Sequence, residues 1–325
     1  MSKKRPKRKD VKPNGGSQDS SDWMPPPDPQ IFDPRQMERL MHDLTRMLSE
    51  QEFESEEEMN DFLQRFMESN EPIPRHKAET PLEKAQELIY EAWETESPRK
   101  RVRLARKALR ISPDCVDAYL ILAEETAESL EEAREFYEQA VEAGERALGP
   151  DALSDLEGNF WLATETRPYM RARLELAQLL WFMDEAQEAI DELHEMLLLN
   201  PNDNQGARYI LLSYLLQDDR NEEAEKLLDD FKEDASPDWL YTHALILFIK
   251  QGPSRGANST LKKALKSNPY VPEFLLGREP VPEDLPQYST PGEPIEAAHY
   301  FLQYVAFWLR TRGAIDWLRD FAPES

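Results

Sequence analysis

The sequence predicts an all-α protein: an α-solenoid of about five helical hairpins, with an N-terminal helical pair and a C-terminal helical cap. Three observations lead to this prediction. One pattern of small, bulky and proline residues recurs along residues 81–269, with neighbouring prolines 32 to 36 residues apart. Apolar residues outside this region fall at helical spacing. Only seven of the 325 residues are valine, which argues against an extensive sheet.

The recurring pattern marks the second helix of each hairpin. A small residue is followed four positions later by a bulky one, three positions later by another core residue, and then by proline. We expect the proline to end the helix, because it cannot continue the hydrogen-bond ladder. The matches are Ala257, Leu261, Ala264 and Pro269; Ala189, Leu193, Met196 and Pro201; Ala224, Leu228, Phe231 and Pro237; and, less fully, Ala133, Tyr137 and Ala140, and Arg101, Ala105, Ala108 and Pro113.

The first helix of each hairpin precedes this pattern at fixed offsets. In the last hairpin, Tyr241, Ala244, Leu245 and Phe248 stand 16, 13, 12 and 9 positions before Ala257, and the other hairpins follow the same spacing. A single hairpin cannot bury both of its faces, so the hairpins are expected to stack and to share one continuous core.

Composition divides the remainder of the chain. Prolines and charged residues predict a disordered arm and a linker, whereas apolar residues at helical spacing predict helices on either side of the repeats. We expect a basic, proline-rich arm at 1–30, a helical pair at 31–70, a linker at 71–80, an insertion at about 149–167 within the repeats, and capping helices at 270–325.

Charge is distributed unevenly. The chain has a net charge of −25, yet residues 1–12 contain seven basic residues and one acid. The acidic body is expected to repel phosphate backbones. Residues 3–12 are therefore the part from which contact with a nucleic acid or another anionic surface is expected. A tail that only keeps the chain in solution explains the same residues equally well.

The sequence predicts a cytoplasmic protein. No apolar run is long enough to cross a bilayer, and no apolar segment follows the basic start as in a secretory signal. The single cysteine, Cys115, cannot form an internal disulfide, which fits a reducing compartment. No membrane partner is expected, and the oligomeric state is left open.

Residues for catalysis, metal binding or cofactor binding are not arranged in any known pattern. The histidines are scattered without paired spacing, and glycines do not form a phosphate-binding loop. Cys115 has no histidine near it in the sequence, so we interpret it as a packing residue. We therefore predict that the protein is not an enzyme and uses no metal or cofactor. The histidines are His42, His76, His194, His243 and His299.

The hairpin pattern over residues 81–269 resembles the tetratricopeptide repeat. Within it, the strings ETRPYMRAR (165–173), LNPNDNQGARY (199–209) and NPYVPEFLLG (268–277) are similar to a group of bacterial and plant repeat proteins. Some of that group are classed with the suppressor-of-tumorigenicity-seven family. The resemblance implies a helical repeat fold and supplies no reaction.

In repeats of this class, the first helices line a concave surface on which peptides or helices bind. Aromatic and arginine side chains on such a surface are typical anchors for a partner. Pairing of the arginines with neighbouring acids explains them as well. Helix capping by Asn202 with Gln205, and a helix start at Thr166, account for much of the two strings. The predicted partner-binding residues are Arg167, Tyr169, Arg171, Gln178, Arg208, Tyr209, Trp239 and His243.

The leading hypothesis is a non-catalytic adaptor that holds a peptide or helix of a partner protein in its concave groove, centred on the third to fifth hairpins. The alternative is a regulatory protein that contacts nucleic acid through residues 3–12. An enzyme of unrecognised type is the third hypothesis, favoured only by the strings that helix capping does not explain.

Overall fold

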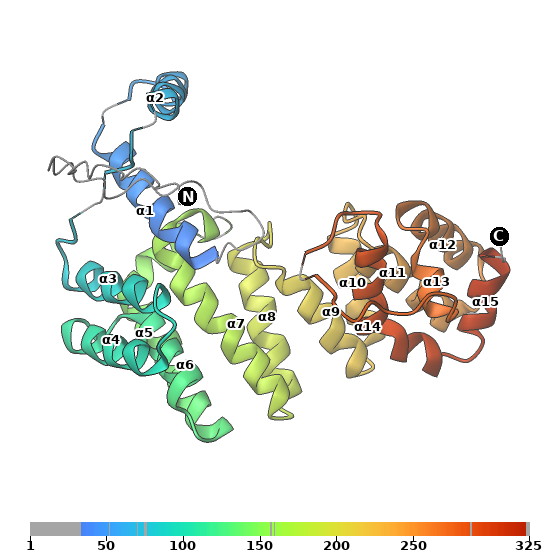
Figure 1. Cartoon of the computed structure of the whole chain (residues 1–325). Coiled ribbons are helices and arrows are strands. Elements are labelled where there is room, and N and C mark those ends of the chain that lie inside the picture. Colours follow the sequence, from blue (N-terminus) through green and yellow to red (C-terminus); the bar gives the residue numbers. More distant parts are fainter. Residues whose placement is uncertain are drawn as a thin grey trace, which may run out of the picture. The chain divides into compact units, whose positions relative to one another are not determined.

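A computed structural model describes residues 34–51, 53–69, 71–74, 77–156, 158, 160–286 and 288–322. The predicted basic arm at 1–30, including residues 3–12, lies outside these residues. The chain divides into two compact units, residues 1–77 and 78–325. The first unit contains α1 (Pro34–Ser49) and α2 (Glu56–Ser69), the predicted N-terminal pair of helices (Figure 1).

The second unit begins with five helical hairpins, which confirms the predicted all-α solenoid of hairpins. Within each hairpin the two helices pack against each other, and each hairpin packs against the next along the chain (Figure 1). The hairpins are α3 (Pro81–Trp93) with α4 (Pro98–Ile111), α5 (Val116–Thr126) with α6 (Leu130–Asp155), α7 (Arg167–Phe182) with α8 (Ala186–Leu199), α9 (Ala207–Gln217) with α10 (Asn221–Asp230), and α11 (Pro237–Gln251) with α12 (Arg255–Ser267).

Small residues stand where helices approach closely, as the repeat pattern predicts. The alanines at the start of the pattern in the third, fourth and fifth hairpins are fully buried: Ala189, Ala224 and Ala257. One apolar cluster joins α3, α4 and α5, a second joins α5 to α8, and a third extends from Phe160 to Leu318. The core is therefore continuous through the second unit, because neighbouring hairpins share their apolar faces.

Two of the pattern's prolines begin helices and do not end them. Pro237 is at the first turn of α11, where Ser236 caps the helix by accepting the backbone N–H of Trp239. Pro81 likewise opens α3 behind a capping box made by Thr80 and Glu83. The expectation that Pro237 ends α10 is wrong, because the first turn of a helix needs no backbone donor and accepts proline readily.

The insertion separates the second and third hairpins. Gly149 breaks the helical backbone of α6 with a φ of 74°, and two short 3-10 helices follow, η1 (Phe160–Leu162) and η2 (Thr164–Thr166). The Thr166 hydroxyl donates to the carbonyls of Phe160 and Ala163. These bonds hold the end of the insertion against α7, which begins at Arg167 as the sequence predicts.

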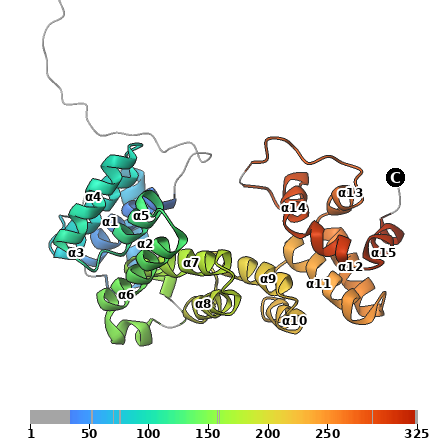
Figure 2. The ribbon, with the colours of Figure 1, turned by 90° about the horizontal axis from the view of Figure 1, so that it is seen from below.

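Three helices complete the second unit: α13 (Val271–Leu275), α14 (Pro294–Arg310) and α15 (Ala314–Phe321). The longest of them, α14, packs against α13, α11 and α9, and a non-helical segment leads into it from α13 (Figure 2). The fully or almost fully buried Tyr300, Tyr304 and Trp308 lie on one face of α14, four residues apart. On α15, Trp317 stacks on Phe248 of α11 at 4.5 Å between ring centroids.

Candidate partner-binding surface

The Arg208 cluster joins the beginnings of α9 and α11 through one guanidinium group. Arg208 donates from Nη1 to Asp203 Oδ2 at 3.0 Å, and from Nε and Nη2 to Asp234 Oδ2 at 3.1 and 2.9 Å. The guanidinium carbon also lies 4.4 Å from the centroid of the Tyr209 ring and 5.6 Å from that of Trp239. We use this name for Asp203, Arg208, Tyr209, Asp234 and Trp239.

Tyr209 completes the hydrogen bonds of the cluster. Its hydroxyl accepts from Arg208 Nη2 at 2.9 Å and donates to Asp234 Oδ2 at 2.7 Å. Burial, with the Asp234 hydrogen bond as the next cause, raises the pKa of Tyr209 to about 12. Although burial acts to raise it, hydrogen bonds from Tyr209, Ser236 and Arg208 hold the pKa of Asp234 below its usual value. Asp234 is therefore a paired anion at neutral pH.

Asp203 caps α9. Its carboxylate accepts the backbone N–H groups of Ala207 at 2.7 Å and Arg208 at 3.0 Å. The predicted capping by Asn202 and Gln205 is wrong, because α9 begins after the left-handed Gly206 and places Asp203 over its first turn. Asp203, four residues before the first residue of α9, is the residue of this string that marks the start of the helix. It also pairs with Arg208.

Arg171 of α7 pairs with a buried acid of α5. Its Nε and Nη2 donate to the two oxygens of Asp117 at 3.1 and 2.9 Å, and its guanidinium lies over the ring of Trp93 at 5.4 Å. Asp117 also accepts from Gln86 of α3 at 2.9 Å. The first helices of three successive hairpins are thus linked through one carboxylate, and such fork-shaped pairs fix geometry as well as charge.

The two predicted residues at the start of α7 contact the insertion. Arg167 donates from Nε to the carbonyl of Trp161 at 3.3 Å and lies over its indole ring. Tyr169 is buried, packs edge-on against Phe160 and accepts from Arg173 Nη1 at 3.3 Å. Both side chains therefore attach the insertion to the third hairpin.

Trp239 and His243 of α11 face α10, the second helix of the preceding hairpin. Trp239 is buried, and its indole N–H donates to the carbonyl of Leu228 at 3.2 Å. Desolvation lowers the pKa of His243, against the attraction of Asp229 and Glu225 on α10. His243 thus senses the second helix of the neighbouring hairpin.

Gln178 lies near the end of α7, where part of the helix surface is exposed. It is exposed on α7, one turn before Phe182, whose side chain is 75% exposed. Trp181 stacks on Tyr214 of α9 with ring centroids 4.0 Å apart and planes 6° apart. Residues three or four positions apart are neighbours on a helix surface, so these side chains form one surface, the α7–α9 patch (Gln178, Trp181, Phe182 and Tyr214).

The helix α11, whose surface was expected to line the groove, packs against another helix of the same chain. Thr242 of α11 is buried, with its hydroxyl 3.5 Å from that of Tyr300 on α14. Arg310 at the end of α14 donates to the carbonyl of Leu216 on α9 at 2.6 Å. Of the surface predicted to form a groove over the third to fifth hairpins, the part on α9 and α11 therefore packs against α14.

The buried thiol of Cys115 has the packing role that the sequence predicts. Its side chain is fully buried beside α3, and burial, followed by the charge of Asp117, raises the pKa of the thiol. A neutral, enclosed thiol is a poor nucleophile.

None of the helices described has the length and apolar composition needed to span a lipid bilayer.

Comparison with known proteins identifies relatives along much of the chain. A model of the ST7 protein family matches residues 77–165, which cover the first two hairpins and the insertion. Suppressor of tumorigenicity 7 protein-like from Homo sapiens is 27% identical over 263 residues, covering 71% of this chain and 44% of that protein. Protein ST7 homolog from Drosophila pseudoobscura pseudoobscura is 25% identical over 261 residues, covering 71% of this chain and 47% of that protein.

The chain spans about half the length of the curated relatives it matches. Among solved structures, YrrB, described as a TPR protein with an unusual peptide-binding site, matches 62% of this chain and 90% of its own, with 20% identity and a TM-score of 0.39. The stacked hairpins confirm the predicted all-α solenoid, and the relatives confirm the predicted similarity to the suppressor of tumorigenicity 7 family. The chain is an all-helical protein of stacked hairpins that resembles the suppressor of tumorigenicity 7 family.

Proposed function

We propose that this chain is a non-catalytic adaptor that binds a peptide or helix of a partner protein on the concave side of its first helices, at the α7–α9 patch. The observation that carries this proposal is the exposure of Phe182 beside the stacked rings of Trp181 and Tyr214. Exposed aromatic groups next to rigid, partly buried rings have the properties of interface anchors.

The position of α14 supports a helix as the preferred ligand. This helix lies against α11 and α9 and places Tyr300 and Tyr304 in the core. The first helices α9 and α11 therefore pack against a helix that presents aromatic residues four positions apart. A partner helix on the α7–α9 patch would use the same mode, with an apolar face against the patch.

The predicted partner-binding residues divide into two roles under this proposal. Gln178 would contact the partner directly. The others would hold the helices that form the surface, because each is engaged within the chain: Arg167, Tyr169, Arg171, Arg208, Tyr209, Trp239 and His243. The buried thiol of Cys115 supports the non-catalytic part of the proposal. We also propose, from the sequence, that the protein is cytoplasmic.

Site-specific photo-crosslinking tests the proposal in the native cell. A photoreactive phenylalanine analogue replaces Phe182 in one variant and Leu198 in another. Leu198 is a matched control, since it is an apolar residue that is 62% exposed on the second helix α8. We expect a discrete partner to be captured from position 182, and a Gln178→Ala change in the same chain to reduce that capture.

The partner's crosslinked peptide should then map to a helical or extended segment. Equal capture of the same proteins from positions 182 and 198 would contradict a specific concave site. If Gln178→Ala leaves the capture from position 182 unchanged, Gln178 is not part of the contact, and the binding surface is centred on Phe182.

A further inference from the structure

A cavity of about 600 Å³ lies where the fourth and fifth hairpins meet the cap. Its wall comes from the turn between α9 and α10, the end of α11, and the segment that joins α14 to α15. It shares no residue with the α7–α9 patch. Its size is that of a small-molecule site, and it is bounded by three elements that are distant in sequence.

Part of the cavity lining is apolar. Phe248 is held in place because its ring stacks on Trp317 of α15, and Ile249 beside it is 42% exposed. An isoleucine that is open to a concave surface, next to a fixed aromatic ring, provides contact area for the apolar part of a ligand.

Arg310 stands at the rim in a fixed orientation. Its Nη2 donates both to the carbonyl of Leu216 at 2.6 Å and to Asp219 Oδ1 at 3.0 Å, and its guanidinium lies 4.6 Å from the ring centroid of Phe307. A guanidinium group has five donors. Both bonds use Nη2, so the donors of Nε and Nη1 have no partner in the described part of the chain.

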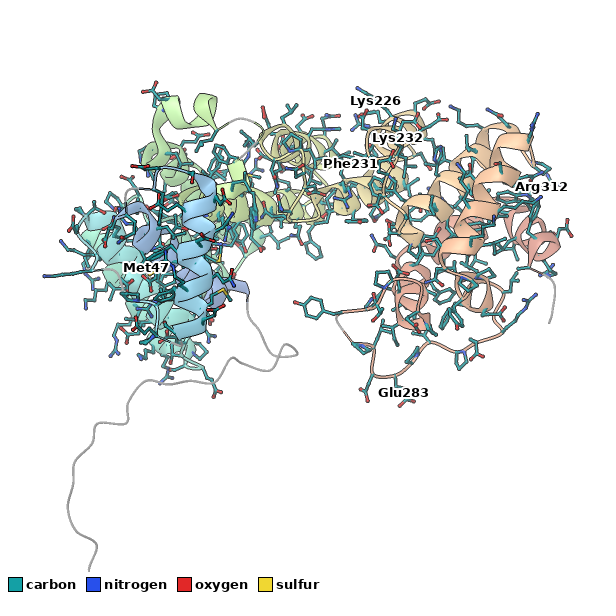
Figure 3. All side chains as sticks on the ribbon, turned by 90° about the horizontal axis from the view of Figure 1, so that it is seen from above. Met47, Lys226, Phe231, Lys232, Glu283 and Arg312 are labelled. Atoms are coloured by element: carbon teal, nitrogen blue, oxygen red, sulfur yellow. The ribbon has the colours of Figure 1, made fainter. Side chains whose placement is uncertain are left out.

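A second arginine gives the rim a positive charge. Arg312 is exposed on the segment between α14 and α15 (Figure 3), and within the described ranges it forms no ion pair. The one acid that lines the cavity, Asp219, is already paired with Arg310. Two arginines against one carboxylate make this a locally cationic place on a chain of net charge −25.

We propose that this cavity binds an amphipathic monocarboxylate, a ligand with an apolar body and one carboxylate group. The apolar body lies on Phe248 and Ile249, and the carboxylate lies between Arg310 and Arg312. This site is independent of the proposed partner surface. A ligand there contacts the fifth hairpin and the cap together, so it stabilises their association by mass action.

Three probes with the same phenylpropyl body test the charge of the ligand: 3-phenylpropionate, 3-phenylpropionamide and 3-phenylpropylammonium. Each is titrated into the full chain, and binding is followed by ligand-observed NMR and by the melting temperature. We expect the carboxylate to bind and to raise the melting temperature. The amide is expected to bind roughly five- to tenfold more weakly, because it lacks charge-assisted hydrogen bonds.

Two substitutions test the position of the carboxylate. Arg312→Gln is expected to weaken 3-phenylpropionate binding about three- to fivefold, as for other exposed ion pairs. Asp219→Asn is expected to strengthen it, because the change removes a repelling charge, and asparagine tolerates the left-handed backbone at this position, where φ is 56°. Arg319→Gln is the control, since Arg319 pairs with Asp316 on α15 and does not line the cavity.

The proposal is overturned if the ammonium probe binds more tightly than the carboxylate, or if Asp219→Asn weakens carboxylate binding. It is overturned equally if none of the probes binds, or if Arg319→Gln has the same effect as Arg312→Gln.

Discussion

At the scale of single residues, the arginines that stand out in this acidic chain hold the repeats in register. Arg208 joins Asp203 before α9 to Asp234 before α11, and Arg171 joins α7 to Asp117 on α5. These guanidinium groups are largely enclosed and each lies over aromatic rings. Planar, forked donors suit such sites, and a lysine does not reproduce them.

Arg208→Lys is therefore expected to destabilise the protein although it keeps the charge. Lysine lacks the planar fork of nitrogens that reaches Asp203 and Asp234 and lies over Tyr209, so we expect a loss of about 1–3 kcal/mol in the free energy of unfolding. Urea denaturation followed by circular dichroism measures it. Arg319→Lys, at an exposed pair on α15, should change stability by no more than about 0.5 kcal/mol. Equal effects of the two changes would contradict a special role for the cluster.

The sequence identified the arginines but not the acids that pair with them. Arg171 and Asp117 are 54 positions apart, and Arg208 and Asp234 are 26 apart. With 64 acidic residues in the chain, no local pattern selects one of them as the partner. The choice depends on how hairpins stack, which is a non-local property. The pairing interpretation of the arginines nevertheless describes what the structure contains.

At the scale of secondary-structure elements, the hairpins were predictable because their signal is local and repeated. Small and bulky residues recur with one spacing in five places, so a weak pattern in one hairpin is supported by the others. Helix starts were less predictable. Proline suits both the end of one helix and the first turn of the next, and only the cap residue before Pro237 decides between them.

A close approach between two helices gives a prediction at this scale. A Cβ atom at Gly144 of α6 would lie 2.5 Å from Cδ2 of the buried Tyr169 on α7. Gly144→Ala is thus expected to destabilise the protein by about 1–3 kcal/mol, although alanine favours helices more than glycine. The melting temperature, measured by calorimetry, should fall.

Gly256→Ala on α12 is the matched control for this substitution. The nearest atom to a Cβ at Gly256 is the Ser254 hydroxyl oxygen at 3.8 Å, so the added methyl group makes only an ordinary van der Waals contact. We expect no loss there, and a gain of up to about 1 kcal/mol from helix propensity. A stabilising effect at both positions would mean that α6 and α7 are not held as closely as described.

At the scale of the whole second unit, the cap determines how the repeats end. The sequence predicted capping helices but not that α14 would pack against α9 and α11. That arrangement depends on contacts between residues such as Thr242 and Tyr300, 58 positions apart. Helical spacing predicts each helix, and it contains no information about which face of the repeats the helix covers.

A carboxylate at this junction makes the association of the cap dependent on pH. Burial, opposed by hydrogen bonds with its own backbone and with Tyr304 of α14, raises the pKa of Asp238 to about 6, and the nearby Asp234 and Glu296 act in the same direction as burial. Between about pH 4 and 6 the Asp238 carboxyl group binds a proton more tightly in the folded protein than in the unfolded chain. The contribution of Asp238 to stability is therefore most favourable below pH 4 and declines as the pH rises through 6.

Asp238→Asn, which keeps an oxygen that accepts from Tyr304, should remove this dependence. We expect the variant to be more stable than the wild type at pH 7, by up to roughly 3 kcal/mol, with the difference narrowing toward pH 4. Melting temperatures measured from pH 4 to 7 test it. Asp230→Asn, at an exposed position on α10, provides the control curve. A constant difference across this pH range would show that Asp238 does not titrate there.

The packing of α14 against α9 and α11 has a consequence for folding during synthesis of the chain. The apolar cluster of α3, α4 and α5 contains only residues close in sequence, so it can close soon after they leave the ribosome. The cluster around α11 needs Tyr300, Tyr304 and Trp308, which are synthesised much later. The first hairpins can thus fold during translation, whereas the fourth and fifth expose apolar surface until α14 emerges and are the segment most open to aggregation or chaperone capture on the way.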